Sequence, residues 1–172
     1  MSLWNERRLP RLAPEFYRGQ SYIHWTHTVQ GRRQGWLNPE FHFIFRERLF
    51  HTCVRYHLCC MSYVLMPDHI HLLWIGTKAE TDQLKATKFL RKHTPIEWQK
   101  QAHDHVLLEK DRTRDALTRV SYYLRENPVR AGIVQNAKDW PYFGSLVPGF
   151  PDIDPSDQDS FWRCFLANSR KL

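Results

Sequence analysis

The segment LCCMSYVLMPDHIHLLWIG, residues 58–76, constrains the fold more than any other part of the chain. It is almost entirely apolar, and Pro67-Asp68 is its main interruption. A proline followed by an aspartate favours a turn or a bulge, because proline cannot donate to a strand ladder. The segment therefore predicts two strands, at residues 58–66 and 69–76, that pair as an antiparallel hairpin.

Other periodic segments place this hairpin in a larger arrangement. Runs rich in β-formers predict a strand before it and a strand after it, and apolar residues at helical spacing predict three helices. The order β-α-β-β-α-β, followed by a helix, predicts an α+β fold of the ferredoxin-like type, in which an antiparallel sheet carries its helices on one face. The predicted strands lie at 21–29 and 103–109, and the predicted helices at 40–57, 81–92 and 112–126.

Several local details accompany these elements. Asn38 is the predicted cap of the first helix and Thr81 the predicted cap of the second, since both side chains can accept a hydrogen bond from the first helical turn. Val54 is expected on the buried face of the first helix, and the chain after Pro128 is expected to be loop-rich. The length of 172 residues favours one domain, at 21–145, with an irregular basic arm at 1–20 and a tail at 146–172 that contains a short helix.

Charge and composition restrict the function. The formal net charge is +7, which favours a polyanionic partner such as nucleic acid. The four cysteines have no C-x-x-C spacing, which is typical of buried thiols in a reducing compartment. No segment approaches the roughly 18 apolar residues of a membrane span, and the N-terminus lacks the apolar stretch of a signal peptide. We therefore expect a cytoplasmic protein with no membrane partner.

The predicted strand at 69–76 carries two histidines, His69 and His71. Residues i and i+2 of a strand face the same side, so the two imidazoles lie together while Ile70 and Leu72 face the other side. Two such imidazoles can bind one cation, or they can be ordinary polar residues with hydrogen-bond partners. A catalytic metal also needs a third protein ligand. The HDH segment, residues 103–105, is a competing pair with the same spacing.

The helix predicted at 112–126 offers the missing ligand. Tyr123 and Asn127 are four residues apart, so a continuing helix would place them on one face. The amide oxygen of Asn127 suits Mg²⁺ or Mn²⁺, and Tyr123 would lie one turn away. Tyr122 points about 100° around the helix and is less suitable. A tyrosine at an amphipathic position can also be a core residue.

MPDHIHLLW, followed about fifty residues later by YYLRENPVRAGIV and then DWPYFGS, resembles the IS200-like single-tyrosine HUH transposases. The closest resemblance is to their branch of REP-associated tyrosine transposases, and it covers roughly residues 20–145. It implies the HUH endonuclease fold, with a tyrosine-bearing C-terminal helix added to the ferredoxin-like sheet. It also implies that His69, His71 and Asn127 bind a divalent metal, Mg²⁺ or Mn²⁺, and that Tyr123 is the catalytic nucleophile.

The activity implied by this resemblance is cleavage and transfer of single-stranded DNA near hairpins, through a covalent 5′-phosphotyrosine intermediate. Such proteins serve DNA transposition and recombination, either as monomers or as homodimers. Asp68 and His105 are expected beside the metal ligands. The arginines expected to contact DNA are Arg32, Arg33, Arg125 and Arg130.

Two alternatives remain open from the residues alone. The chain could be a domesticated protein that binds DNA hairpins without cutting them. It could also be a metal-binding module for RNA on a ferredoxin-like sheet, although the aromatic pattern of such modules is absent.

Overall fold

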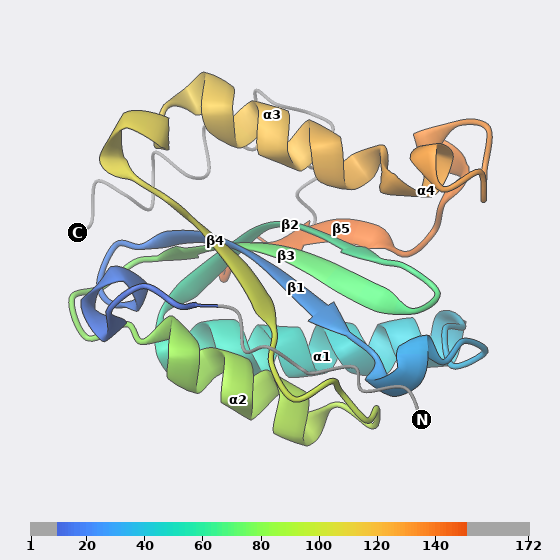
Figure 1. Ribbon diagram of the computed structural model, residues 1–172, viewed down its shortest axis with the longest axis horizontal. Helices are drawn as coiled ribbons and strands as arrows, with labels where there is room; N and C mark the ends of the chain where they lie inside the picture. The colour runs from blue at the N-terminus through green and yellow to red at the C-terminus, as the bar shows by residue number, and fades with distance from the viewer. Residues whose placement is uncertain (1–9, 151–172) are drawn as a thin grey trace.

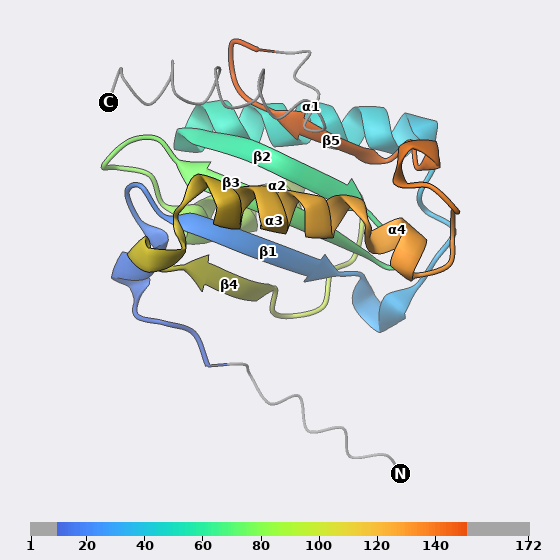
Figure 2. The ribbon, with the colours of Figure 1, turned by 90° about the horizontal axis from the view of Figure 1, so that it is seen from above.

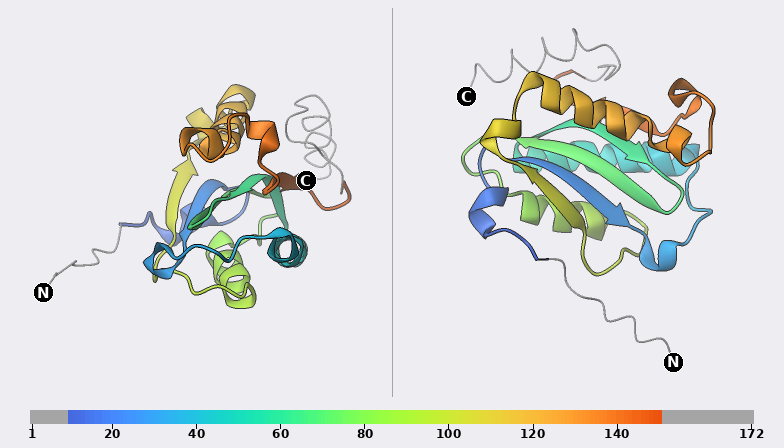
Figure 3. Two further views of the ribbon diagram at one scale, coloured as in Figure 1. Left: turned by 90° about the vertical axis from the view of Figure 1, so that its right-hand side faces the viewer. Right: turned by 45° about the horizontal axis from the view of Figure 1, so that its top comes forward.

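An antiparallel sheet of five strands, in the order β4-β1-β3-β2-β5, separates two layers of helices (Figure 1). The computed structural model describes residues 10–150. Helices α1 and α2 cover one face of the sheet, and α3 crosses the other face, as the end-on view shows most clearly (Figure 3). The strands are β1 (Tyr22–Thr28), β2 (Leu58–Leu65), β3 (His69–Gly76), β4 (His103–Leu107) and β5 (Phe143–Leu146), and the helices are α1 (Pro39–Tyr56), α2 (Gln83–His93), α3 (Arg114–Arg125) and α4 (Asn127–Arg130).

The predicted fold class is confirmed. The first four strands and the three long helices form where the periodicity of the sequence places them, and the strand order β4-β1-β3-β2 is ferredoxin-like. The predicted hairpin pairs β2 with β3, with a register shift between Cys60 and Ser62. Such a bulge puts one extra residue into a strand, which explains why Cys60 and Tyr63 contribute to the same core cluster.

Both faces of β3 are covered, which accounts for its nearly continuous apolar sequence. Ile70, Leu72 and Trp74 pack in the core between the sheet and the α1–α2 layer. Leu73 and Ile75 belong to a second core beneath α3, where Leu117 and Leu124 of that helix are also buried. The predicted alternation of β3 is therefore confirmed, and His69 and His71 lie on the α3 face.

The predicted N-terminal cap is correct for α1 and wrong for α2. Asn38 caps α1 as expected, because its Oδ1 accepts from the backbone N–H of Phe41 at 2.8 Å. Thr81 was the wrong choice for α2: the cap is Asp82, which accepts from the backbone N–H of Lys85, while the buried Thr81 hydroxyl donates to the carbonyl of His57. Val54 was also placed wrongly, since 50% of it is exposed on the outer side of α1.

The segment after α4 contains a strand where loop was predicted. β5 pairs with the outer edge of β2, next to α1 (Figure 2). Gly144 is required there, because a Cβ on it would lie 2.7 Å from the hydroxyl of Tyr63. The pairing is a long-range contact, so this short segment carries little local signal for a strand.

Part of the predicted basic arm packs against the body of the protein. Residues Pro14–Tyr17 form a 3₁₀ helix, and Tyr17 is fully buried with its hydroxyl donating to Asp104 Oδ2 at 2.6 Å. An irregular arm is therefore the wrong description for this part of 1–20. Residues 1–9, and the short helix predicted near 161–167, lie outside the described residues.

Candidate functional site

The candidate site lies where β3 begins and β1 ends, on the face of the sheet that α3 covers. In the antiparallel register His71 is opposite Thr26, and His69 is opposite Thr28. His71 is 7% exposed, whereas the side chain of His69 is 21% exposed at the end of the strand. The site is thus built on the central strand of the sheet and opens at one end of it.

The two histidines direct their Nε2 atoms at each other. These atoms are 3.1 Å apart, and the ring planes are nearly perpendicular at 89°. Two nitrogens that bind one divalent ion at ~2.1 Å, in adjacent coordination positions, are about 3.0 Å apart. The spacing of the pair therefore fits shared coordination of a single cation as well as a hydrogen bond between the two imidazoles.

His69 is oriented by a chain of polar contacts. Its Nδ1 lies 2.6 Å from Asp68 Oδ1, and Arg32 donates to the other carboxylate oxygen of Asp68 at 2.8 Å. Although burial alone would raise it, the pKa of Asp68 is lowered by its hydrogen bonds with His69 and Arg32. An ionised Asp68 accepts the Nδ1 proton and leaves the Nε2 lone pair of His69 free for a metal. This contact supports the predicted position of Asp68 beside a ligand.

His71 is held from β1. Its Nδ1 lies 3.0 Å from Thr26 Oγ1 and 3.0 Å from His24 Nε2. Burial lowers the pKa of His71 to about 2, and the neighbouring His24 and His69 lower it further. Burial, followed by His105 and His103, also lowers the pKa of His24 to about 4. Both imidazoles are therefore neutral at neutral pH, which is the protonation state that a histidine needs in order to bind a metal.

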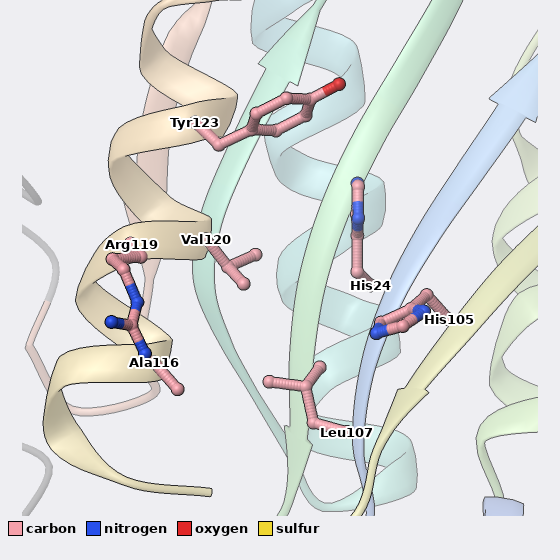
Figure 4. Close-up of a pocket in the computed structure, with 7 residues that line it drawn as sticks. All are labelled: His24, His105, Leu107, Ala116, Arg119, Val120 and Tyr123. Atoms are coloured by element: carbon pink, nitrogen blue, oxygen red, sulfur yellow. The ribbon is translucent and has the colours of Figure 1, made fainter. Parts of the chain in front are cut away.

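His24, His69 and His71 form a histidine cluster, and Tyr123 of the same chain lies next to its member His24. Its ring centroid is 6.5 Å from that of His24, and it is 48% exposed, so a large ligand can reach it (Figure 4). Arg130 places its guanidinium carbon 3.7 Å from the centre of the Tyr123 ring and donates to the Tyr123 carbonyl at 3.1 Å. The structure therefore brings the predicted tyrosine and the histidine cluster together within one chain.

Asn127 is placed differently from the prediction. It begins α4 rather than continuing α3, and its Nδ2 donates to the carbonyls of Tyr123 and Leu124 at 3.2 Å each. Its Oδ1 accepts from Arg130 Nη2 at 3.0 Å. Within residues 10–150 no hydrogen bond joins Asn127 to His69, and no cluster of three His, Cys, Asp or Glu side chains is arranged to hold a metal. A metal at the histidine pair would therefore have two protein ligands in this arrangement, and a third would have to come from a rearranged Asn127 or from outside the protein.

The predicted DNA-contacting arginines fall into two groups. After β1, Arg32 forms an ion pair with Asp68 and Arg33 forms one with Glu97, so part of their positive charge is neutralised within the protein. Arg130 lies against Tyr123, and Arg125 is partly exposed in the last turn of α3. Basic charge at the tyrosine therefore comes mainly from the α3–α4 side.

The competing HDH segment forms most of β4 and, like the His69–His71 pair, belongs to no cluster of three His, Cys, Asp or Glu side chains within the described part of the chain. Asp104 contacts Tyr17 and Arg11. His105 pairs directly with His24 in the sheet, so it lies one contact away from His71. This placement supports the predicted position of His105 beside the site.

Comparison with known proteins finds similarity both in sequence and in solved structures. A Haemophilus influenzae protein provisionally named a REP-associated tyrosine transposase is 25% identical over an alignment 163 residues long, which covers 83% of this chain and 89% of the relative. The resemblance to the REP-associated tyrosine transposases is therefore confirmed. A solved REP-associated tyrosine transposase bound to a REP hairpin has the same fold, with a TM-score of 0.65 and 20% identity over 78% of this chain and 82% of that one. No family model matches the chain.

Two residues of the site, His24 and Thr26, were missed from the sequence, although both contact His71. Their signal is the same i, i+2 spacing within the first strand. That signal becomes useful only with the pairing register, which places Thr26 opposite His71. Among the helices within residues 10–150, none is long and apolar enough to cross a membrane.

Proposed function

We propose that this chain is a metal-dependent endonuclease and strand transferase for single-stranded DNA that cuts beside DNA hairpins through Tyr123. The observation that carries the proposal is the approach of Tyr123 to the histidine cluster within one chain, with ring centroids of Tyr123 and His24 6.5 Å apart. The hairpin substrate is suggested by the solved relative, which is bound to a REP hairpin. The net charge of +7 suits such a polyanion.

His69 and His71 would hold one Mg²⁺ or Mn²⁺ through their Nε2 atoms, since the 3.1 Å separation of these atoms fits that role. A bound divalent ion supplies electrostatic stabilisation of negative charge on the phosphate. Asn127 would add its Oδ1 as a third ligand once Arg130 releases it. Arg130 is well placed to move to a DNA phosphate, because it already lies at the exposed face of Tyr123.

In the proposed reaction the Tyr123 hydroxyl oxygen attacks the phosphorus of the scissile phosphate and loses its proton. The bond from phosphorus to the 3′-oxygen breaks, and that oxygen takes up a proton to become a free 3′-hydroxyl. The product is a 5′-phosphotyrosine linked to Tyr123. Because the phosphodiester energy is retained, another 3′-hydroxyl can attack the linkage and join two strands.

The test is covalent capture of DNA. A labelled stem-loop deoxyoligonucleotide with single-stranded arms is incubated with the protein and Mg²⁺ or Mn²⁺ and resolved on a denaturing gel. We expect a protein–DNA adduct that is absent from Tyr123→Phe and from His71→Ala, and present in Tyr122→Phe. Tyr122 is a matched control, because it is the adjacent tyrosine and is 62% exposed. Tight binding without any adduct would instead support a hairpin-binding protein that does not cut.

A further inference from the structure

A pocket of about 400 Å³ lies between α3 and the strands β1 and β4, next to Tyr123 (Figure 4). Its apolar lining comes from Leu107, Ala116 and Val120. Its polar lining comes from His24, His105 and Arg119, and the ring of Tyr123 closes one end. None of the roles proposed above uses the part of this pocket that lies away from Tyr123.

The lining has the chemistry of a site for a flat, polar ring. The aliphatic side chains on the helix can contact the face of such a ring, and the imidazoles of His24 and His105 can stack on it or bond to its edge. The guanidinium of Arg119 adds a cation that can stack on a base or contact a phosphate.

We propose that this pocket binds one unpaired nucleobase of the DNA strand, adjacent to the phosphate that Tyr123 attacks. The pocket volume is at the small end of the usual range for ligand sites, roughly 300–1,000 Å³, which admits a single base with its sugar and excludes a duplex. The inference rests on the proposed function, because the tyrosine that closes the pocket is the proposed nucleophile.

The pocket is also connected to the histidine pair. His24 lines the pocket, and its Nε2 lies 3.0 Å from Nδ1 of His71. A base that contacts the free side of the His24 ring would therefore act on the orientation of His71 through one hydrogen bond. This connection makes the pocket a determinant of which nucleotide lies at the cleavage position, rather than a remote anchor.

The test uses filling substitutions and abasic DNA. Binding is measured by fluorescence anisotropy with the Tyr123→Phe protein, which retains the aromatic ring but cannot form the covalent adduct. The DNA is a series of the same stem-loop, and each member carries one abasic position in its single-stranded arms. Loss of one stacked base should weaken binding about 5- to 150-fold at a single arm position. Ala116→Phe should remove that penalty by filling the pocket, and Val120→Phe provides a second filling variant should the first not fold.

Ala79→Phe is the matched control, because it makes the same change at an exposed alanine outside this pocket. The control should keep the abasic penalty. A flat abasic profile in the parent protein, or an Ala116→Phe profile identical to that of the parent, overturns the proposal. These binding results are separate from adduct formation, so the pocket can stand while the proposed cleavage fails.

Should the stem-loop not bind at all, the proposed function fails, and the pocket is then tested directly. Each deoxynucleoside 5′-monophosphate is titrated into the parent protein while the ring resonances of His24 and His105 are followed by NMR. Shifts that Ala116→Phe abolishes support a base site. The absence of shifts with every nucleotide overturns it.

Discussion

His27 lies in the core between the sheet and the α1–α2 layer, where 1% of its surface is exposed. Neither of its ring nitrogens has a hydrogen-bond partner within the described part of the chain, and its ring packs against Trp25 and Trp98, with centroid distances of 6.1 and 5.7 Å. We predict that His27→Phe makes the protein more resistant to acid. A phenyl ring has a similar shape and leaves no buried nitrogen without a partner.

The size of the expected gain in acid resistance follows from the pKa of His27. Burial lowers this pKa from 6.5 to about 3, and the nearby Arg91 and Arg11 contribute further. Between these two values the unfolded chain binds more protons than the folded protein, so the free energy of unfolding falls as the pH falls below about 6.5. At about pH 5 the loss from His27 alone is about 2 kcal/mol, and it is nearly absent at about pH 7. The phenylalanine variant should also be at least as stable at neutral pH, since an unsatisfied buried polar group costs about 1–3 kcal/mol.

The assay is urea unfolding followed by tryptophan fluorescence at both pH values, with the free energy of unfolding extrapolated to water. The fall in this free energy from neutral to acid pH should be about 2 kcal/mol smaller in His27→Phe than in the parent protein. Other acid-sensitive groups remain in both proteins and cancel in the comparison. His51→Phe is the control, because His51 is an exposed residue of α1. Equal falls in the parent and in His27→Phe would refute the reasoning.

Substitutions at three further positions have defined outcomes. Asn38→Ala should lower the free energy of unfolding by about 1 kcal/mol in urea unfolding, because it removes the cap of α1. Gly76→Ala should lower the free energy of unfolding by at least about 3 kcal/mol in the same assay, since the added Cβ would lie 1.9 Å from the carbonyl oxygen of Gly19. A decrease below about 1 kcal/mol would contradict this expectation and show that the end of the strand can move. If the proposed function holds, Asp68→Ala should raise the Mn²⁺ concentration needed for half-maximal adduct formation about 10- to 100-fold. Asp68→Asn, which keeps an acceptor for His69, should raise it much less.

The parts of the fold that could be predicted are those with a local signal. The alternation of β3 identified which face carries His69 and His71, because both the core residues and the histidines follow a two-residue period. The start of α1 was identified by Asn38, whose cap is a contact between near neighbours. Strand β5 could not be identified in this way, since its pairing with β2 joins segments about eighty residues apart.

The same distinction applies to the site. The residue types and spacing indicated His69, His71 and Tyr123. The structure brings His69 and His71 into contact and places Tyr123 beside His24, which contacts His71. The contact between Asn127 and Arg130 could not be predicted, because the argument from helical spacing assumes that α3 continues past Glu126. In the structure Asn127 begins α4, and its side chain donates back to a carbonyl of α3. Side-chain partners at a helix end depend on three-dimensional packing that periodicity does not describe.

The order of the site along the chain has a consequence for synthesis. Strands β1 and β3, which carry the imidazole cluster, are complete by Gly76, whereas Tyr123 follows only after β4, in the last long helix of the described chain. A polypeptide truncated before α3 would keep the cluster but would have no tyrosine to attack DNA. If the proposed activity is correct, incomplete products of translation are harmless to cellular DNA, and cutting begins only when the end of the domain has been made.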